Sequence, residues 1–227
     1  MSTLLLSGWA QPASALAHVA PGAHAFDYSD YPSADTAIAA LTHIAPRRVI
    51  AWSLGGQLAL RAMAAGALRP QHVTLIAAPL QFVSDANLKG MDATTYQLFR
   101  ESYVRDPART KARFHGLIAK GDREMKRVMG LLAHHPNVET VAHWLPWLED
   151  LAAYRLDVSA LASAPPTLII HGMNDAIVPL AQSEALTAAL PSAQLNAWAE
   201  VGHAPHVHDA ARLMAEIAAH QQQHGVA

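Results

Sequence analysis

The chain has 227 residues, of which 52% are hydrophobic and 15% are charged, and its formal net charge is −2 at neutral pH. This composition is typical of a folded globular protein, which excludes a disordered chain and gives no reason to expect a nucleic-acid partner. The sequence contains no cysteine, so disulfides, thiolate zinc sites and a cysteine nucleophile are excluded. It has no signal-peptide pattern at its start and no apolar run of 18 residues, so we expect a cytoplasmic protein without a membrane span.

Short apolar runs predict buried strands, and amphipathic runs predict helices. In chain order we predict a strand at 3–6, a helix at 13–19, a strand at 24–28, a helix at 33–43 capped by Ser33, a strand at 47–52, a helix at 54–65 and a strand at 72–77. Strands at 167–171 and 194–198 and a helix at 210–220 follow near the end. This alternation predicts an α/β fold with a mostly parallel sheet and helices on both faces.

One long segment interrupts the alternation. Residues 80–164 contain no convincing strand, and their patterns predict helices at 94–104, 107–119, 122–133 and 138–152. We therefore predict an α/β core formed by residues 1–79 and 165–227, with a helical lid at 80–164 inserted after the strand at about 72–78.

The most informative segment is residues 51–56, Ala-Trp-Ser-Leu-Gly-Gly, which lies between a predicted strand and a predicted helix. A serine at such a junction, with small neighbours, is typical of a nucleophile elbow. The tight turn would expose the Ser53 hydroxyl at the C-terminal edge of the sheet. The following helix would direct free N–H groups to the same place, where negative charge could develop.

A serine hydroxyl needs a base to accept its proton and an acid to orient that base. Asp175 follows the predicted strand at 167–171, and His203 follows the one at 194–198, next to Gly202. Both therefore belong to the same edge of the sheet as Ser53. Each segment alone is a weak signal, but the order Ser, Asp, His, with each residue after a predicted strand, is a strong one.

Simpler interpretations exist for each residue. Ser53 could be an ordinary turn serine, and Asp175 a turn or capping residue. Asp150 and Asp157 are rival acids, but they lie in or near the predicted lid. The rival bases, His206 and His208, lie at the start of the last helix, where histidines usually pack or face solvent.

The 14 histidines raise the question of a metal site. The adjacent pair His134 and His135 and the pair His206 and His208 lack carboxylates at helical ligand spacing. We therefore predict no metal and no cofactor.

Together, the serine elbow, the segment His-Gly-Met-Asn-Asp-Ala-Ile-Val-Pro at 171–179 and the segment Val-Gly-His-Ala-Pro-His at 201–206 resemble the α/β-hydrolase family over essentially the whole chain. The resemblance implies Ser53 as nucleophile, Asp175 as orienting acid and His203 as general base. It also implies an oxyanion hole formed by the backbone N–H groups of Leu54 and Trp9.

The sequence departs from the family pattern at two positions. The elbow has Ala51 where the family usually has glycine, which should add some crowding without removing the turn. The loop after the first strand has Ser7 where a bracing histidine is usual, and a serine side chain is shorter. Neither departure removes a catalytic group.

A narrower resemblance rests on Gly8 and Trp9, on residues 52–56 and on the length of the helical insertion. These features are similar to the pimeloyl-acyl-carrier-protein methyl ester esterases of biotin synthesis, which implies a carrier-bound ester as substrate. In that interpretation Trp9 and Trp52 line an apolar acyl pocket, although both could simply pack in the core. Trp144 and Trp147 are expected to pack between lid and sheet.

Positive charge is concentrated in the predicted lid, where residues 100–127 contain nine lysines and arginines against four acidic residues. A solvated helical face explains this equally well, but the resemblance suggests docking of an acidic carrier protein. The candidates are Arg100, Arg105, Arg109, Arg113, Arg123 and Arg127. The alternatives are a general small-ester carboxylesterase or thioesterase, and a catalytically silent binding protein. We expect a monomer.

Overall fold

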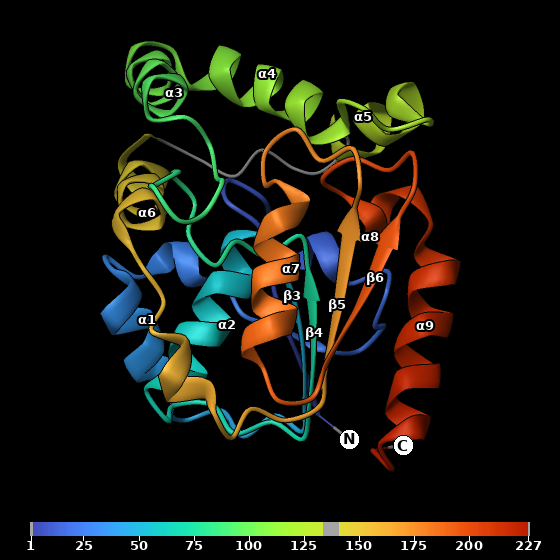
Figure 1. Cartoon of the computed structure of the whole chain (residues 1–227). Coiled ribbons are helices and arrows are strands. Elements are labelled where there is room, and N and C mark those ends of the chain that lie inside the picture. The colour runs from blue at the N-terminus through green and yellow to red at the C-terminus, as the bar shows by residue number, and fades with distance from the viewer. Residues whose placement is uncertain (1, 134–140, 227) are drawn as a thin grey trace.

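The computed structural model describes residues 2–133 and 141–226, and within them six strands form one sheet (Figure 1). The strand order is β2-β1-β3-β4-β5-β6, and every neighbouring pair is parallel. The strands are β1 (Thr3–Leu6), β2 (His24–Ala25), β3 (Arg48–Trp52), β4 (His72–Ile76), β5 (Thr167–Gly172) and β6 (Ala193–Trp198). The predicted parallel α/β sheet is confirmed.

The register aligns the ends of the strands. Leu6 of β1 lies opposite Ala51 of β3, and Trp52 of β3 lies opposite Ile76 of β4. On the other side of β4, Gly172 of β5 lies opposite Trp198 of β6. The loops that leave these strands therefore meet at one edge of the sheet, as expected for a parallel sheet whose ligand site lies at the carboxyl ends of its strands.

Helices cover both faces of the sheet (Figure 1). Helices α1 (Ala34–Leu41), α2 (Leu54–Ala64) and α7 (Leu180–Ala189) lie on one face. The long C-terminal helix α9 (Ala210–Gln223) lies on the other face, preceded by the short α8 (Pro205–His208). Ser33 caps α1 as predicted, since its Oγ accepts a hydrogen bond of 3.3 Å from Thr36 N.

Two early elements are shorter than predicted. The predicted helix at 13–19 is a single 3-10 turn, η1 (Ala13–Leu16). The predicted strand at 24–28 stops after Ala25, because Asp27 caps a second 3-10 turn, η2 (Tyr28–Asp30). The Asp27 carboxylate accepts a hydrogen bond of 3.0 Å from Ser29 N, which favours the turn over a longer strand.

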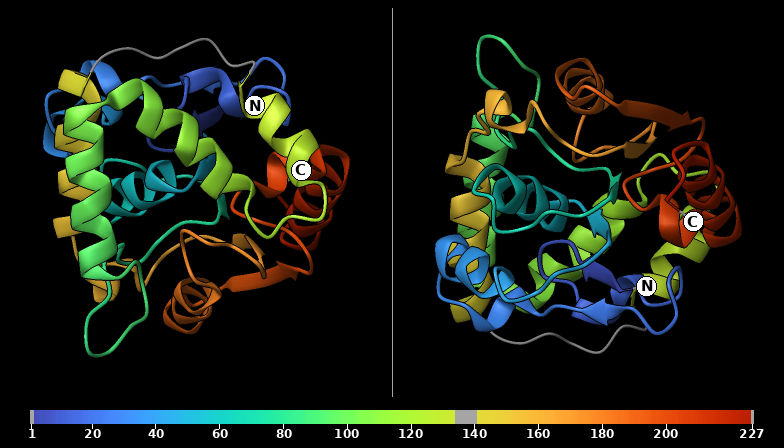
Figure 2. Two further views of the ribbon diagram at one scale, coloured as in Figure 1. Left: turned by 90° about the horizontal axis from the view of Figure 1, so that it is seen from above. Right: turned by 90° about the horizontal axis from the view of Figure 1, so that it is seen from below.

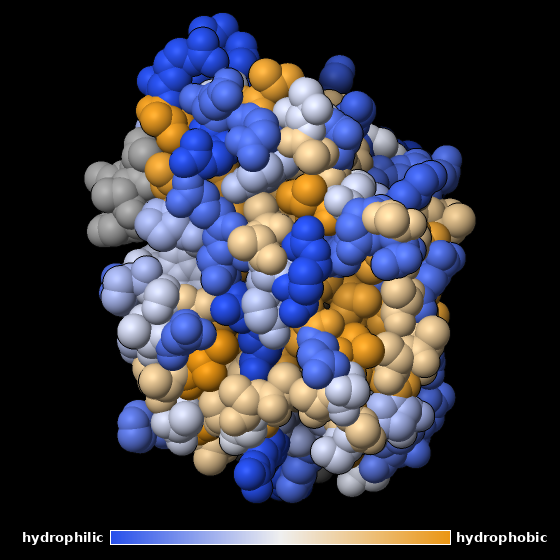
Figure 3. Space-filling view, turned by 60° about the vertical axis from the view of Figure 1, so that its left-hand side comes forward, coloured by the Kyte–Doolittle hydropathy of each residue, from blue (hydrophilic) through white to orange (hydrophobic). Residues whose placement is uncertain are grey.

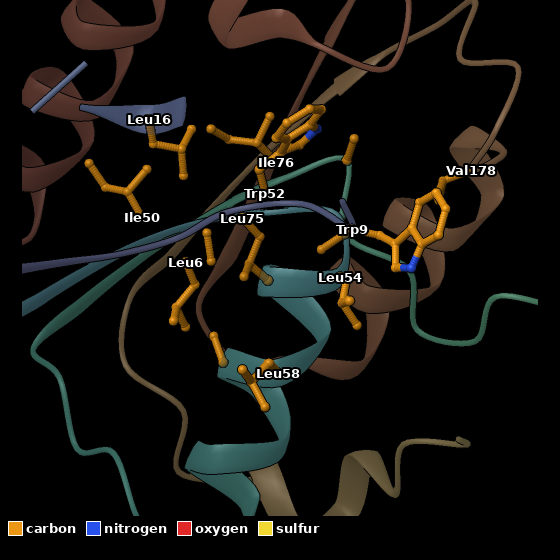
Figure 4. Close-up of a cluster of buried hydrophobic side chains, with 14 of the residues drawn as sticks. Leu6, Trp9, Leu16, Ile50, Trp52, Leu54, Leu58, Leu75, Ile76 and Val178 are labelled. Atoms are coloured by element: carbon orange, nitrogen blue, oxygen red, sulfur yellow. The ribbon is translucent and has the colours of Figure 1, made fainter. Parts of the chain in front are cut away.

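The sheet core is built from alternating side chains of β3. Figure 4 shows Trp52 and Ile50 near Leu16, while Leu54 and Leu58 belong to α2 below the strands. Residues i and i+2 of a strand share a face, so Trp52 and Ile50 point toward the side of η1. Figure 4 also shows that the rings of Trp52 and Trp9 point away from each other.

Four helices, called the cap helices below, lie over the C-terminal edge of the sheet (Figures 1 and 2). They are α3 (Ala93–Arg105), α4 (Pro107–Ala119), α5 (Met125–Ala133) and α6 (Val141–Ala153). The start of the helix predicted at 138–152 lies outside the described residues. The division of the chain at residues 80 and 164 stays a prediction. In the described part of the chain, no helix is both long and apolar enough to cross a membrane.

The last cap helix, α6, is attached to the sheet layer by aromatic residues and an ion pair. Trp144 and Trp147 are buried, and both pack edge-on against Tyr28, which confirms the packing role expected for them. Arg61 of α2 forms a two-point ion pair with Asp150 of α6. The helix that begins at the serine elbow is thus joined directly to the cap.

Candidate active site

Ser53 lies in a strained turn between β3 and α2. Its backbone angles, φ 53° and ψ −120°, are rarely adopted by a residue with a side chain, and such strain is concentrated at functional sites. Gly55 packs so closely on the end of β1 that a Cβ atom there would overlap the carbonyl oxygens of Leu6 and Ser7. The elbow forms with Ala51 in the place where the family usually has glycine.

The three sequence-predicted residues Ser53, His203 and Asp175 are brought together. His203 Nε2 lies 2.9 Å from Ser53 Oγ, and His203 Nδ1 lies 2.6 Å from Asp175 Oδ2. All three side chains are buried, with Ser53 6% exposed. This arrangement can move a proton from the serine hydroxyl to the imidazole while the carboxylate holds the ring.

The Asp175 carboxylate is held in its ionised form. Burial alone would raise its pKa, but the nearby His203 and His171 rings and their hydrogen bonds bring the pKa well below its ordinary value. Its other oxygen, Oδ1, accepts hydrogen bonds from the backbone N–H groups of Ile177 and Val178, at 2.8 and 2.9 Å. These contacts fix the carboxylate in both position and charge.

His171, the last-but-one residue of β5, also contacts this carboxylate, and sequence reasoning assigned it no role. Its Nε2 lies 3.3 Å from Asp175 Oδ2 and 2.8 Å from the carbonyl oxygen of Val178. Its Nδ1 lies 2.6 Å from Ser183 Oγ on α7. A tautomer with the proton on Nε2 satisfies all three contacts, so His171 donates to the Asp175 carboxylate and helps to hold it in place. Its position four residues before Asp175 was the available signal.

The two residues expected to form an oxyanion hole, Leu54 and Trp9, lie in adjacent segments. Leu54 is the first residue of α2, and the N–H groups in the first turn of a helix have no acceptor within the helix. Trp9 follows β1, whose end contacts Gly55 of the same helix turn. The role of their N–H groups stays a prediction.

The loop after β1 is braced from η2. Tyr28 Oη donates a hydrogen bond of 2.5 Å to the carbonyl oxygen of Ser7. Burial, and to a lesser degree the charge of Asp27, raises the pKa of Tyr28, so its hydroxyl keeps its proton. Tyr28 thus braces the loop, whereas the Ser7 hydroxyl is buried and finds no hydrogen-bond partner among the described residues.

A narrow apolar pocket opens beside Ser53, and its free volume is about 10 Å³, roughly the room that one water molecule needs. Trp9 and Ile177 line it from the sheet side, as expected for Trp9. The other lining residues come from the cap helices and the segment before them: Phe82, Met91, Phe99, Phe114, Leu117, Leu148 and Leu151. Apart from the serine, the lining side chains are hydrophobic, which suits an acyl chain.

The structure places Trp52 elsewhere than expected. It is fully buried on the opposite side from the pocket, where its ring packs 4.3 Å from the ring of His206. Its Nε1 donates a hydrogen bond of 2.9 Å to the carbonyl oxygen of His203. The prediction that Trp52 lines the acyl pocket is therefore wrong, because the alternation along β3 turns its side chain to the other face.

Three of the six candidate arginines are engaged within the molecule. Arg100 binds Glu149 of α6. Arg123 Nη1 lies 3.4 Å from Glu200 Oε2. Arg127 donates to the carbonyl oxygens of the last two residues of α8, Val207 and His208. These three side chains attach the cap helices, or the segments between them, to other parts of the molecule.

The remaining three arginines gather around one surface groove at the junction of α3 and α4. Arg105, Arg109 and Arg113 are exposed and line the groove together with Ser102, Asp106 and Thr110. Arg109 and Arg113 are four residues apart on α4 and therefore share a face of the helix. Figure 3 shows strongly hydrophilic side chains at the upper end of the molecule, where the cap helices lie.

The rival acids and bases have other contacts. Asp150 pairs with Arg61, and Asp157 caps a 3-10 turn through Ser159 N, at 3.0 Å. His206 packs under Trp52, and His208 Nδ1 lies 2.9 Å from Asp122 Oδ1.

No set of three histidine or carboxylate side chains in the described part of the chain is arranged to hold a metal ion. His134 and His135 lie outside the described residues.

A family model for the alpha/beta hydrolase family matches residues 4–216. The chain belongs to the α/β-hydrolase family. The hydrolase fold is also found in solved structures of low sequence identity. A bromoperoxidase from Bacillus anthracis superposes with a TM-score of 0.80 at 17% identity, covering 97% of this chain and 91% of that one. An esterase from Exiguobacterium antarcticum superposes with a TM-score of 0.78 at 15% identity, covering 98% of this chain and 92% of that one.

Among the α/β-hydrolases, two relatives named pimeloyl-[acyl-carrier protein] methyl ester esterase are more similar in sequence. The one from Nitrosomonas europaea is 35% identical over 166 residues, which are 69% of this chain and 64% of the relative. The one from Aromatoleum aromaticum is 33% identical over 181 residues, which are 74% of this chain and 72% of the relative. The first match thus spans less than two thirds of that relative's length.

Proposed function

We propose that this protein is a serine esterase that hydrolyses a carboxylic ester at Ser53. The observation that carries the proposal is the continuous contact from Asp175 through His203 to Ser53 Oγ, at 2.6 and 2.9 Å, at the wall of an apolar pocket. A nucleophile, a base and an orienting acid in line are the groups that acyl transfer requires.

The reaction follows from this geometry. His203 Nε2 accepts the Ser53 proton as Oγ attacks the ester carbonyl, and the backbone N–H groups of Leu54 and Trp9 stabilise the oxyanion. The tetrahedral intermediate collapses, and the leaving alcohol takes the proton from His203. A water molecule, deprotonated by His203, then attacks the acyl-enzyme, and the acid is released as Ser53 regains its proton.

We propose that the preferred substrate is a pimeloyl methyl ester carried by acyl carrier protein, as the names of the two relatives suggest. The hydrophobic lining of the pocket supports this, because a chain of methylene groups is stabilised by apolar contact. In this proposal the cap helices act as a lid over the chain. The groove of Arg105, Arg109 and Arg113 contacts the acidic carrier protein, since these three arginines are exposed on the cap.

Hydrolysis of a short p-nitrophenyl ester tests the catalytic part of this proposal. The wild type should turn over, and Ser53→Ala should lose at least about 10³-fold in kcat, because covalent catalysis disappears while binding remains. Equal rates for the two proteins would eliminate Ser53 as nucleophile. No turnover of any ester or thioester by the wild type would favour a binding protein instead.

Charge reversal tests the carrier part. Arg109→Glu with Arg113→Glu should raise KM for the carrier-bound methyl ester and leave hydrolysis of a p-nitrophenyl ester unchanged. Arg69→Glu is the matched control, because Arg69 is exposed and precedes β4, at the opposite edge of the sheet from the cap. An unchanged KM that is also insensitive to salt would favour a general small-ester esterase.

Complementation of a biotin auxotroph lacking this esterase tests the substrate directly.

A further inference from the structure

The turn between α4 and α5 contacts the loop that carries His203. His203 N donates to the carbonyl oxygen of Ile118 at the end of α4, at 2.9 Å. Within the turn, Arg123 N donates to the carbonyl oxygen of Glu200, at 2.8 Å. A Cβ atom on Gly202 would lie 2.8 Å from Ile118 O, so the loop and the cap touch at backbone level. The cap helices therefore fix the backbone on which the proposed base is mounted.

The side chain of Asp122, which lies in this turn, contacts the chain both before and after His203. Its Oδ2 accepts a hydrogen bond of 3.2 Å from Gly202 N, and its Oδ1 lies 2.9 Å from His208 Nδ1. Oδ1 also accepts a hydrogen bond of 2.7 Å from Glu124 N, which closes the turn itself. The Asp122 side chain is 1% exposed, and His208 is 11% exposed, so neither contact competes freely with water.

The two partners of Asp122 outside the turn lie on either side of His203 in the chain. Gly202 immediately precedes His203, and His208 ends the short helix α8 that follows it. A single carboxylate thus spans the segment that determines where the His203 imidazole points. On the sheet side, the hydrogen bond from Trp52 Nε1 to the His203 carbonyl oxygen holds the same segment.

We propose that Asp122 is a positioning residue that keeps His203 in line between Ser53 and Asp175, and that it makes this alignment depend on the cap. The inference rests on the proposed ester hydrolysis. Asp122 is not among the residues that line the pocket, so its effect should appear in the chemical step and not in substrate binding.

The test is kinetic, on the full chain with a short p-nitrophenyl ester. We expect Asp122→Ala to lower kcat about 10- to 100-fold with KM within about twofold of wild type, because small displacements of a reacting group have effects of that size. Loosening of the cap alone would instead raise KM, since the cap helices line the pocket. His208→Ala removes the other end of the contact from a more exposed site, and we expect a smaller loss in kcat.

Two controls separate positioning from stability. Asp92→Ala removes another cap carboxylate, which accepts a hydrogen bond of 2.9 Å from Thr95 N at the start of α3, and it should leave kcat unchanged. The double variant Asp122→Ala with His208→Ala should lose little more than Asp122→Ala, because both changes remove the same contact. Thermal melts establish which variants are folded at the assay temperature.

Unchanged kcat in folded Asp122→Ala, an effect on KM alone, or an equal loss of kcat in Asp92→Ala would each overturn the inference. If Asp122→Ala does not fold, His208→Ala decides: lower kcat at unchanged KM supports positioning, and wild-type kcat overturns it. The proposed function is tested separately by the wild type. Turnover that Asp122→Ala retains in full contradicts only the positioning role, whereas a wild type without turnover contradicts both.

Discussion

The Nε1 group of Trp52 donates a 2.9 Å hydrogen bond to the carbonyl oxygen of His203, 151 residues away in the chain. Trp52 immediately precedes Ser53, so the strand end that carries the proposed nucleophile also holds the loop of the proposed base. The indole is buried, and so are residues 201–204 around the accepting carbonyl. This contact fixes the distance between two of the three reacting groups more directly than sheet packing alone.

Replacing Trp52 with phenylalanine should therefore lower activity as well as stability. The change leaves the buried His203 carbonyl without its donor, which costs about 1–3 kcal/mol of unfolding free energy. We expect kcat for a short ester to fall by about 10-fold, because the imidazole shifts. Urea unfolding and steady-state kinetics measure the two effects.

Trp198→Phe is the matched control for this change. Trp198 is equally buried, and its Nε1 donates a 3.1 Å hydrogen bond to Glu216 on α9, away from the site. It should lose comparable stability and keep its kcat. If both variants showed the same kcat as wild type, Trp52 would have only a packing role.

Phe99 should limit the length of the acyl chain. Its ring lies 5.5 Å from Trp9 and 5.6 Å from Phe114 at the pocket wall. Phe99→Ala enlarges a pocket that is narrow in this structure, so kcat/KM should rise for p-nitrophenyl octanoate relative to the acetate, by about 10-fold. A series of p-nitrophenyl esters from two to ten carbons measures the profile.

Leu98→Ala is the control for Phe99→Ala, since Leu98 immediately precedes Phe99 on α3 but is 59% exposed. Its chain-length profile should match the wild type. The same shift in both variants would mean that α3 has loosened and that the Phe99 ring does not set the chain length.

The parts of the site that could be predicted from sequence are those encoded by local pattern. Ser53, Asp175 and His203 each follow a strand, and parallel strands bring such loops to one edge whatever the rest of the chain does. Tyr28 and Asp122 were missed because their partners, Ser7 and Gly202, are distant in sequence. Trp52 was assigned to the wrong face of the sheet. Residues two apart on a strand share a face, so its position two residues after Ile50 could have indicated the correct one.

The arginines show a different limit. Their number in residues 100–127 predicts a basic region, but only tertiary contacts separate Arg100 and Arg127, which bind within the molecule, from Arg105 and its neighbours at the groove. Helical periodicity does not reveal which acidic or carbonyl group lies opposite each side chain.

The histidine pair formed by His72 and His220 should make stability fall in mild acid. His72 Nε2 lies 2.8 Å from His220 Nδ1, and both side chains are buried. Burial, and then the neighbouring His220, His224 and Arg48, lowers the pKa of His72 from 6.5 to about 4. Protonation of His72 therefore favours the unfolded state. The contribution of neutral His72 to the free energy of unfolding is fully present above pH 6.5, and it is lost as the pH falls toward 4, by at most about 3 kcal/mol.

Urea unfolding at pH 7.5, 5.5 and 4.5 measures this slope. His72→Gln can keep a hydrogen bond to His220 but cannot gain a proton, so it should flatten the slope. Some slope should remain, because burial also lowers the pKa of His220. Identical slopes in the two proteins would assign the acid sensitivity to other groups.

The central claim is that His203 and Asp175 activate Ser53 as a nucleophile. It is tested most directly by intact mass and peptide mapping after treatment with a p-nitrophenyl phosphonate, which reacts covalently with an activated serine. The account predicts one adduct, located on Ser53, none in Ser53→Ala, and labelling at least about 100-fold slower in His203→Ala. Labelling of Ser53→Ala at the wild-type rate, or an unmodified Ser53 in the wild type, would contradict it.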